Sequence, residues 1–401
     1  MNKINWKTSV TRFLSAQTIS LLGSSIVQYA IIWYITLTTS SGKMLTISTL
    51  CGFLPQIFIS LFAGVWIDRY ERKKLIMLSD SVIAVSTLLL AAAFFMGHEN
   101  TWFLFAVLMI RSAGTGIQTP AVNAIIPQIV PEEHLMRING INSTLSSVMM
   151  FLSPVISGSI LSFAPLWAAL LIDVVTAVIG VGITSTVFVN PQERRDGKGS
   201  SGLEEIKGGI FYLKENKFIR GLLIYQITIL FLISPSAFLT PLMVSRSFGS
   251  EVWRLTASEM TYSLGMVLGG LLIASWGGFR EKIKTTLLAG AAYGILMAGL
   301  GTAPVFLVYL LCNTMIGVTS PCYNTPLTVT IQEKVPSHLH GRIFSFMQIA
   351  TSCALPLGMT FFGPLADRVP IRNLLAGAGG AVILVSVYAW IFACSRKKNV
   401  I

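Results

Sequence analysis

The stretch from residue 46 to residue 96 reads TISTLCGFLPQIFISLFAGVWIDRYERKKLIMLSDSVIAVSTLLLAAAFFM. Two apolar runs, 46–67 and 75–96, flank the charged segment Asp68-Arg-Tyr-Glu-Arg-Lys-Lys74. Each run has about the 20 apolar residues that cross the hydrocarbon core of a bilayer as an α-helix. The stretch therefore predicts two membrane-spanning helices that meet at a short basic loop.

The same alternation of apolar runs and short polar loops extends over all 401 residues. Only 11% of the residues are charged, against about 25% in soluble domains, which excludes a soluble fold. We therefore predict an all-α membrane protein with twelve transmembrane helices. Besides the two runs above, the predicted spans are 12–37, 102–126, 139–163, 166–188, 219–244, 256–276, 285–302, 304–325, 341–363 and 374–394.

One connection between spans is long and polar. Within it, four aliphatic residues recur at helical spacing between charges: Leu203, Ile206, Ile210 and Leu213. This pattern predicts an amphipathic helix on the membrane surface, and a flexible linker is the alternative. The predicted domains are an N-terminal six-helix bundle (1–188), a cytoplasmic linker (189–218) and a C-terminal six-helix bundle (219–401).

Basic residues are distributed unevenly between the two sides of the predicted membrane. Of the 29 Lys and Arg residues, 23 fall on the side of the N-terminus and Arg111 lies inside a span. Five fall on the other side: Lys43, Arg246, Arg254, Arg368 and Arg372. Because cytoplasmic loops are enriched in Lys and Arg, both termini are predicted to be cytoplasmic. The net charge of +12 thus reflects membrane topology, and no nucleic-acid partner is expected.

Two segments six spans apart share one sequence frame. Residues 116–123 read GIQTPAVN and residues 317–324 read GVTSPCYN. The fourth and fifth spans thus correspond to the tenth and eleventh. Parallel six-span halves are typical of secondary transporters, whose substrate site lies near the membrane midplane.

The loop after the second span carries a family resemblance. Gly64-Val-Trp-Ile-Asp68-Arg69-Tyr-Glu71-Arg72-Lys73 resembles the signature GxxxD(R/K)xG(R/K)(R/K) of the major facilitator superfamily, with Glu71 replacing the second glycine. The resemblance implies two six-helix bundles of the major facilitator type. It also implies a conformational-switch loop that comprises Gly64, Asp68, Arg69, Arg72 and Lys73. A second GxxxDR frame, Gly363 to Arg368, falls on the outer side.

Two further motifs resemble those of the same superfamily. Arg111-Ser-Ala-Gly114-Thr-Gly116 is similar to its buried-arginine motif, although the glycine spacing is shifted. Ser153-Pro154-Val-Ile-Ser157-Gly158 is similar to the antiporter signature GPxxGG, with serines for two glycines. The resemblance of the second motif implies an exporter, and ordinary packing of small residues is the alternative.

Over nearly the whole chain the sequence resembles the macrolide efflux group of bacterial drug exporters. Gly52-Phe-Leu-Pro55 and Gly341-Arg-Ile-Phe-Ser345 are among the segments that carry this resemblance. It implies proton-driven export of macrolides or similar amphipathic drugs across the bacterial inner membrane, by a monomer. The alternatives are an exporter of another amphiphile, such as a siderophore or lipid-like metabolite, and a non-transporting membrane sensor.

Few ionisable residues lie within the predicted spans, and these are the candidates for proton coupling. Asp173 is the deepest acid and our first choice; otherwise it is a structural partner for a polar group on the third or fourth span. Arg111, Asp80 and Glu259 complete the set. Each buried charge requires a partner or water, because an isolated charge is costly in hydrocarbon.

Amide and aromatic side chains on the cavity helices are the candidates for contact with substrate. They suit bulky amphipathic molecules and are Gln17, Gln28, Tyr29, Trp33, Gln226, Phe231, Phe238, Asn313, Tyr323 and Asn324. The chain has no GxxxxGK[ST] motif and no metal-ligand or nucleophile constellation. We therefore expect no enzyme activity, no cofactor and no metal, and an ion gradient as the energy source.

Overall fold

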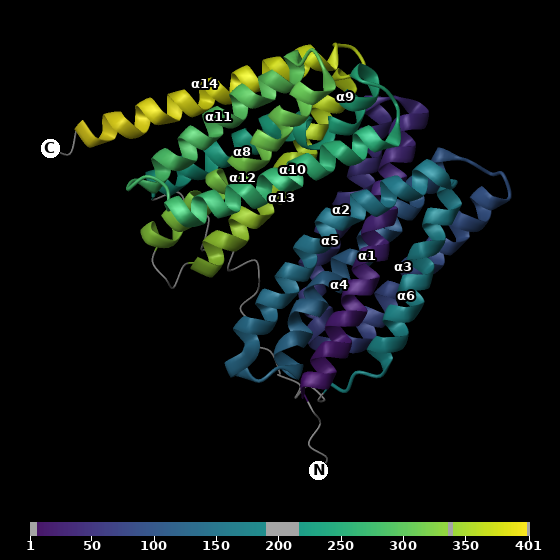
Figure 1. Cartoon of the computed structure of the whole chain (residues 1–401). Helices are drawn as coiled ribbons and strands as arrows, with labels where there is room; N and C mark the ends of the chain where they lie inside the picture. The colour runs from purple at the N-terminus through teal and green to yellow at the C-terminus, as the bar shows by residue number, and fades with distance from the viewer. Residues whose placement is uncertain (1–5, 190–215, 336–339, 399–401) are drawn as a thin grey trace. The chain divides into compact units, whose positions relative to one another are not determined.

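The structure is a computed structural model that describes residues 6–189, 216–335 and 340–398 (Figure 1). All regular secondary structure in these ranges is helical, which confirms the predicted all-α class. The described residues form two compact units, one built on α1–α6 and the other on α8–α14. Two short pieces cluster with the opposite unit, Ser40–Thr46 with the second and Glu251–Thr256 with the first. The amphipathic helix predicted within 189–218 lies outside the described residues.

The first unit is a bundle in which α1 packs against α5 and α6, while α3 packs against α4 and α6 (Figure 1). Its core includes Phe13, Ile76 and Ile125, each fully buried. The helices are α1 (Trp6–Thr39), α2 (Gly42–Arg69), α3 (Arg72–Phe95), α4 (Thr101–Ile129), the 3-10 turn η1 (Glu132–His134), α5 (Leu135–Phe163) and α6 (Leu166–Ser185).

The second unit repeats this pattern of helix contacts. Its helix α8 packs against α13 and α14, and α11 packs against α12 and α14. Each of these pairs corresponds to a pair in the first unit six spans earlier, as the repeated GxxxPxxN frame predicts. The helices are α8 (Lys217–Phe238), α9 (Thr240–Ser247), α10 (Val252–Trp276), α11 (Lys282–Thr302), α12 (Phe306–Lys334), α13 (His340–Leu365) and α14 (Ile371–Lys398).

The glycine of the repeated frame allows a close approach of two helices in both units. A Cβ atom on Gly116 of α4 would lie 2.9 Å from the carbonyl oxygen of Gln56 on α2. A Cβ atom on Gly317 of α12 would collide with the carbonyl oxygen of Tyr262 on α10. Small residues allow membrane helices to approach this closely, so the frame marks a tight helix crossing in each unit.

Ten of the described helices are long and apolar enough to cross a membrane. The other two predicted spans correspond to α4 and α13, which have 29 and 26 residues; α4 is made less apolar by Arg111 and Gln118. One predicted boundary is wrong, because 219–244 is not a single helix. The chain leaves the α8 helix at Leu239 and restarts as α9, where Pro241 occupies a first-turn position that needs no backbone N–H.

Candidate functional site

A buried ion pair joins α4 to α6 in the first unit. Arg111 Nη1 donates to Asp173 Oδ2, and the two side chains are only 5% and 1% exposed. The pair is embedded in further hydrogen bonds: Arg111 Nη1 lies 2.7 Å from Thr87 Oγ1, and Arg111 Nη2 lies 3.0 Å from the carbonyl oxygen of Ser24. The hydroxyl of Ser24 donates to Asp173 Oδ1 at 2.9 Å. Both oxygens of Asp173 are therefore occupied.

Asp80 on α3 has a different environment. Its Oδ1 accepts hydrogen bonds from Ser20 Oγ at 3.1 Å and from Gln118 Nε2 at 2.5 Å. Its Oδ2 is buried and has no hydrogen-bond partner in the described part of the chain. The nearby cation, Arg111, is already paired with Asp173. Asp80 is thus a buried carboxylate whose direct hydrogen-bond partners are neutral groups.

A cavity of about 380 Å³ opens beside these residues within the first unit. Arg111, Ser20 and Gln118 lie in its wall, so both buried acids are one side chain away from it. The rest of the wall consists mainly of hydroxyl and amide side chains from α1, α2, α4 and α5. The arrangement thus places a polar chamber beside ionisable groups that are buried within the spans.

Two of the predicted substrate-contacting residues lie in this cavity, namely Gln17 and Gln28. The other two predictions on α1 do not. Tyr29 and Trp33 form a tilted aromatic pair with ring centroids 5.6 Å apart, and the Trp33 side chain is buried. Trp33 therefore contributes to helix packing.

Most of the residues in the second unit that were predicted to contact substrate instead pack against, or form hydrogen bonds with, other residues of that unit. Phe231 packs against Phe361 and Phe362, and Tyr323 packs against Tyr225 inside the core of this unit. Asn313 donates to the Ser258 carbonyl oxygen at 2.7 Å. Asn324 is exposed and donates to the Ser320 carbonyl oxygen at 3.1 Å. Gln226 is buried. Phe238 is half-buried near the end of α8.

Four amides of the cavity wall are not among the predicted residues: Gln56, Gln118, Asn123 and Asn142. A periodic signal is present for part of this set. On α4, Arg111, Thr115 and Gln118 recur at intervals of four and three residues, and all three line the cavity. Such a polar stripe on an apolar helix marks its wet face.

The basic residues of the switch loop anchor the start of α3. Arg72 Nη1 donates to the Ala124 carbonyl oxygen on α4 at 2.5 Å. Lys73 Nζ donates to the carbonyl oxygens of Ser185 and Val187 at the end of α6, at 2.6 and 2.8 Å. Cations stabilise helix C-termini in this way. Arg69 is exposed, whereas the surroundings of Gly64 and the side chain of Asp68 lie outside what the structure describes.

The serine-for-glycine antiporter motif lies on α5. The hydroxyl oxygens of Ser153 and Ser157 are buried without a hydrogen-bond partner among the described residues. Pro154 lies between them inside the helix, and a Cβ atom on Gly158 would collide with Thr256 Oγ1 and lie 3.3 Å from the Trp33 ring. The motif therefore supplies a small-residue surface for tight packing against α1.

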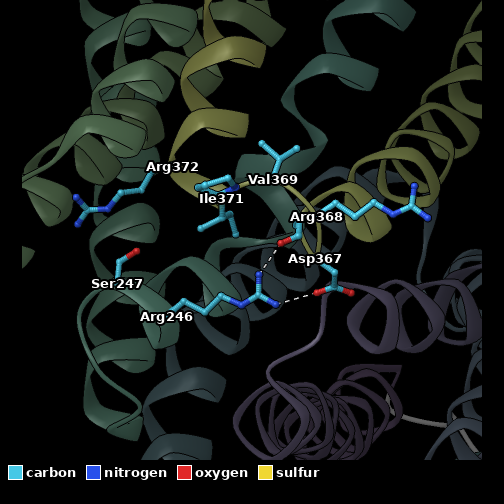
Figure 2. A pocket seen from close by; sticks show the side chains of 9 residues that line it. Arg246, Ser247, Asp367, Arg368, Val369, Ile371 and Arg372 are labelled. Atoms are coloured by element: carbon cyan, nitrogen blue, oxygen red, sulfur yellow. Dashed lines mark hydrogen bonds and ion pairs between the residues drawn. The ribbon is translucent and has the colours of Figure 1, made fainter.

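The second GxxxDR frame, Gly363 to Arg368, contributes a helix cap in the second unit. Asp367 accepts hydrogen bonds from the backbone N–H groups of Gly42 and Lys43, at 2.7 and 2.9 Å, and from Ser41 Oγ at 3.0 Å. Figure 2 shows Arg246 reaching Asp367, with Nη2 to Oδ1 at 2.8 Å. Burial alone would raise the pKa of Asp367, but these hydrogen bonds outweigh it and hold the pKa below its usual value.

Glu259 on α10 is the remaining ionisable candidate. It is partly buried in the second unit, and no cation contacts it among the described residues. Its neighbour Ser258 is bonded to Asn313 and lies 3.3 Å from the Tyr309 hydroxyl. Glu259 belongs to the second unit, whereas Asp80 and Asp173 belong to the first.

Sequence comparison identifies relatives over almost the whole chain. The sequence profile of the Major Facilitator Superfamily matches residues 13–359. Macrolide efflux protein A of Streptococcus pyogenes is 31% identical over 387 residues, which cover 96% of this chain and 95% of that protein. Macrolide efflux protein A of Enterococcus faecalis is 31% identical over 323 residues, which cover 80% of this chain and 99% of that protein.

Structural comparison agrees with the sequence relatives. A crystal structure of a nucleoside transporter superposes with a TM-score of 0.71 and covers 96% of this chain and 98% of that one. Because the two sequences are only 15% identical, this similarity concerns the fold alone.

Proposed function

Because the chain belongs to the major facilitator superfamily, we propose that it exports macrolides or similar amphipathic drugs in exchange for protons. The observation that carries this proposal is the 31% identity to a macrolide efflux protein over 96% of the chain. The expected setting is the bacterial inner membrane, with both termini cytoplasmic, since Lys and Arg concentrate on that side. The protein is proposed to act as a monomer.

Proton coupling requires a group that gains and loses a proton beside the transport pathway. Asp173 is the first choice from the sequence, but its two oxygens are held by Arg111, Ser24 and Thr87. Asp80 has a buried oxygen without a partner among the described residues, and two of its donors, Ser20 and Gln118, line the cavity. A buried charge without a counter-charge is costly, and a proton removes that cost. Asp80 is therefore the proposed proton-binding residue, and the Arg111–Asp173 pair fixes the electrostatic surroundings.

Charged neighbours of Asp80 come from two helices packed around it. They are Asp173 on α6 and Arg111 on α4, which form an ion pair with each other. The groups that face it from α1 are neutral, with Ser20 in direct contact. Protonation of Asp80 thus changes the net charge beside the cavity by one unit.

The proposal is tested by accumulation of labelled erythromycin in cells with and without the protein, before and after a protonophore. Lower accumulation that the protonophore abolishes is the expected result. Equal accumulation at matched membrane abundance would remove the macrolide assignment and leave the transporter fold intact.

The proton site is tested by Asp80→Asn, which keeps an acceptor oxygen for Ser20 and is nearly isosteric. Purified variant reconstituted in proteoliposomes should still bind drug but should lose the export driven by an imposed pH gradient. Undiminished gradient-driven export by Asp80→Asn would transfer the role to Asp173 or Glu259. Asp80→Glu provides a second test, because it should retain the gradient response.

A further inference from the structure

The cavity of the first unit has a wall suited to hydroxyl groups. Six of its lining side chains are amides: Gln17, Gln28, Gln56, Gln118, Asn123 and Asn142. Gln118 donates to Asp80, whereas the side chains of the other five make no hydrogen bond within the described residues. The Nε2 atom of Gln17 is even buried without a partner in this part of the chain. Each free amide offers both a donor and an acceptor to whatever fills the chamber.

Among the described residues, the same wall lacks the groups that usually bind an ammonium cation. None of the described residues that line the cavity is Asp or Glu, and Phe53 is the single aromatic among them. Asp173 is turned toward Arg111 and Asp80 toward Ser20 and Gln118. The charged residue in the wall is Arg111, whose Nε atom is buried without a hydrogen-bond partner among the described residues. An ammonium group would find neither a carboxylate nor an aromatic cage here.

The size of the cavity limits what part of a large substrate enters it. Its volume of about 380 Å³ is near the lower end of the ~300–1,000 Å³ range of drug-sized pockets. A macrolide is larger than most drugs, so the chamber accommodates a substituent of the ring system and not the whole molecule. Leu21, Val122 and Leu145 supply an apolar surface beside the amides.

We infer that the first unit binds the neutral, hydroxyl-bearing sugar of a glycosylated amphiphile through these amides, and that the substrate's amine makes no recognition contact there. The oxygen of an amide side chain can accept a hydrogen bond from one hydroxyl while its NH₂ group donates to a neighbouring one. A site built for hydroxyls discriminates against analogues that lack them. This inference rests on the proposed export function but specifies the chemical group that is recognised. It predicts that glycosylation, and not basicity, decides which macrolides are bound.

The experiment uses the full chain in proteoliposomes with its five native cysteines replaced and the substitution Ser25→Cys, at a position that lines the cavity. The readout is protection of this introduced thiol from a maleimide. The ligands are erythromycin, its amine N-oxide, and erythromycin from which the neutral sugar has been hydrolysed. The first two should protect at concentrations within about threefold of each other, and the third should require at least about tenfold more.

Two variants locate the effect. Gln28→Ala and Asn142→Ala should each raise the protecting concentration of erythromycin about three- to tenfold, the loss expected for one hydrogen bond. They should also reduce the discrimination against the deglycosylated drug. Asn373→Ala is the matched control, because Asn373 is an exposed amide in the second unit and should leave both values unchanged.

Protection by the deglycosylated drug but not by the N-oxide would overturn the inference. If no macrolide protects the introduced thiol of the Ser25→Cys protein, the macrolide assignment fails, and a second ligand pair still tests the cavity. 4-Nitrophenyl glucoside should then protect and benzyltrimethylammonium should not. Protection by the ammonium compound alone would contradict hydroxyl recognition whatever the natural substrate is.

Discussion

The Arg111–Asp173 pair should show strong energetic coupling, because both side chains lie almost completely out of contact with solvent at 5% and 1% exposure. In Arg111→Met, Asp173 keeps only hydroxyl donors from Ser24 and Thr87. In Asp173→Leu, the guanidinium keeps only Thr87 and the Ser24 carbonyl oxygen. Breaking a buried pair on one side typically costs about 3–5 kcal/mol, since the remaining charge is uncompensated.

The double variant Arg111→Met/Asp173→Leu removes both charges at once. A buried pair replaced by apolar residues is often nearly neutral for stability, so the double variant should lose far less than the sum of the singles. The expected coupling energy is about 3 kcal/mol. It is measured from unfolding in mixed micelles, followed by the fluorescence of the protein's eight tryptophans.

A control pair is present in the same unit. Lys74 and Glu71 are 3.0 Å apart but are 75% and 68% exposed, so their coupling should be within about 0.5 kcal/mol. Additive effects at Arg111 and Asp173, within about 0.5 kcal/mol, would refute the argument that a dry environment makes this pair interdependent.

Three further predictions concern packing, the outer cap and topology. Gly317→Ala should lower the free energy of unfolding by about 1–3 kcal/mol, because its Cβ would meet the Tyr262 carbonyl oxygen, whereas Gly140→Ala, with open space around it, should not destabilise the protein. Asp367→Asn should lower the thermal midpoint at neutral pH; since the folded pKa of Asp367 is depressed, the difference from the parent should shrink as the pH falls below about 3.9, and a constant difference would contradict the cap. Cysteines at Arg69 and at His98 should be labelled from the inside and the outside respectively, and the reverse pattern would invert the topology.

Much of the fold could be predicted from the sequence, because span length and charge bias are local signals. At Leu239, however, the apolar run 219–244 continues although the helix does not. Hydrophobicity cannot detect this break, since both α8 and α9 contribute buried apolar residues. The sequence signal for this break is Pro241, because proline favours the first turn of a new helix.

The site was less predictable, because a helical repeat reveals which face is polar but not which neighbour that face meets. Arg111 and Asp173 were recognised as buried charges, yet their pairing depends on the rotation of α6 against α4. Gln118 follows Arg111 by seven residues on the same face, but the sequence does not reveal that this face meets Asp80. In the second unit, aromatic and amide residues such as Phe231 and Asn313 look the same in sequence whether they line a cavity or fill a core.

The two units share a fold but differ in the chemistry of their interiors. The residue that corresponds to Arg111, five positions before the shared glycine of the repeat, is Cys312 in the second unit. The next residue, Ser112 in the cavity wall, corresponds to Asn313, whose amide is bound to Ser258.

In the second unit, helices are connected by hydroxyl pairs such as Tyr225 with Ser386, whose oxygens are 3.1 Å apart. In the first unit, the Arg111–Asp173 ion pair connects the helices. Hydroxyl pairs carry no charge, whereas a carboxylate loses its charge when it binds a proton. Among the described residues, the buried carboxylates and guanidinium are those of Asp80, Asp173 and Arg111, and all three lie in the first unit beside the amide-lined cavity. A proton bound at Asp80 and a sugar bound by the amides would share Gln118, which donates to Asp80 and lines the chamber, so each should alter the affinity for the other.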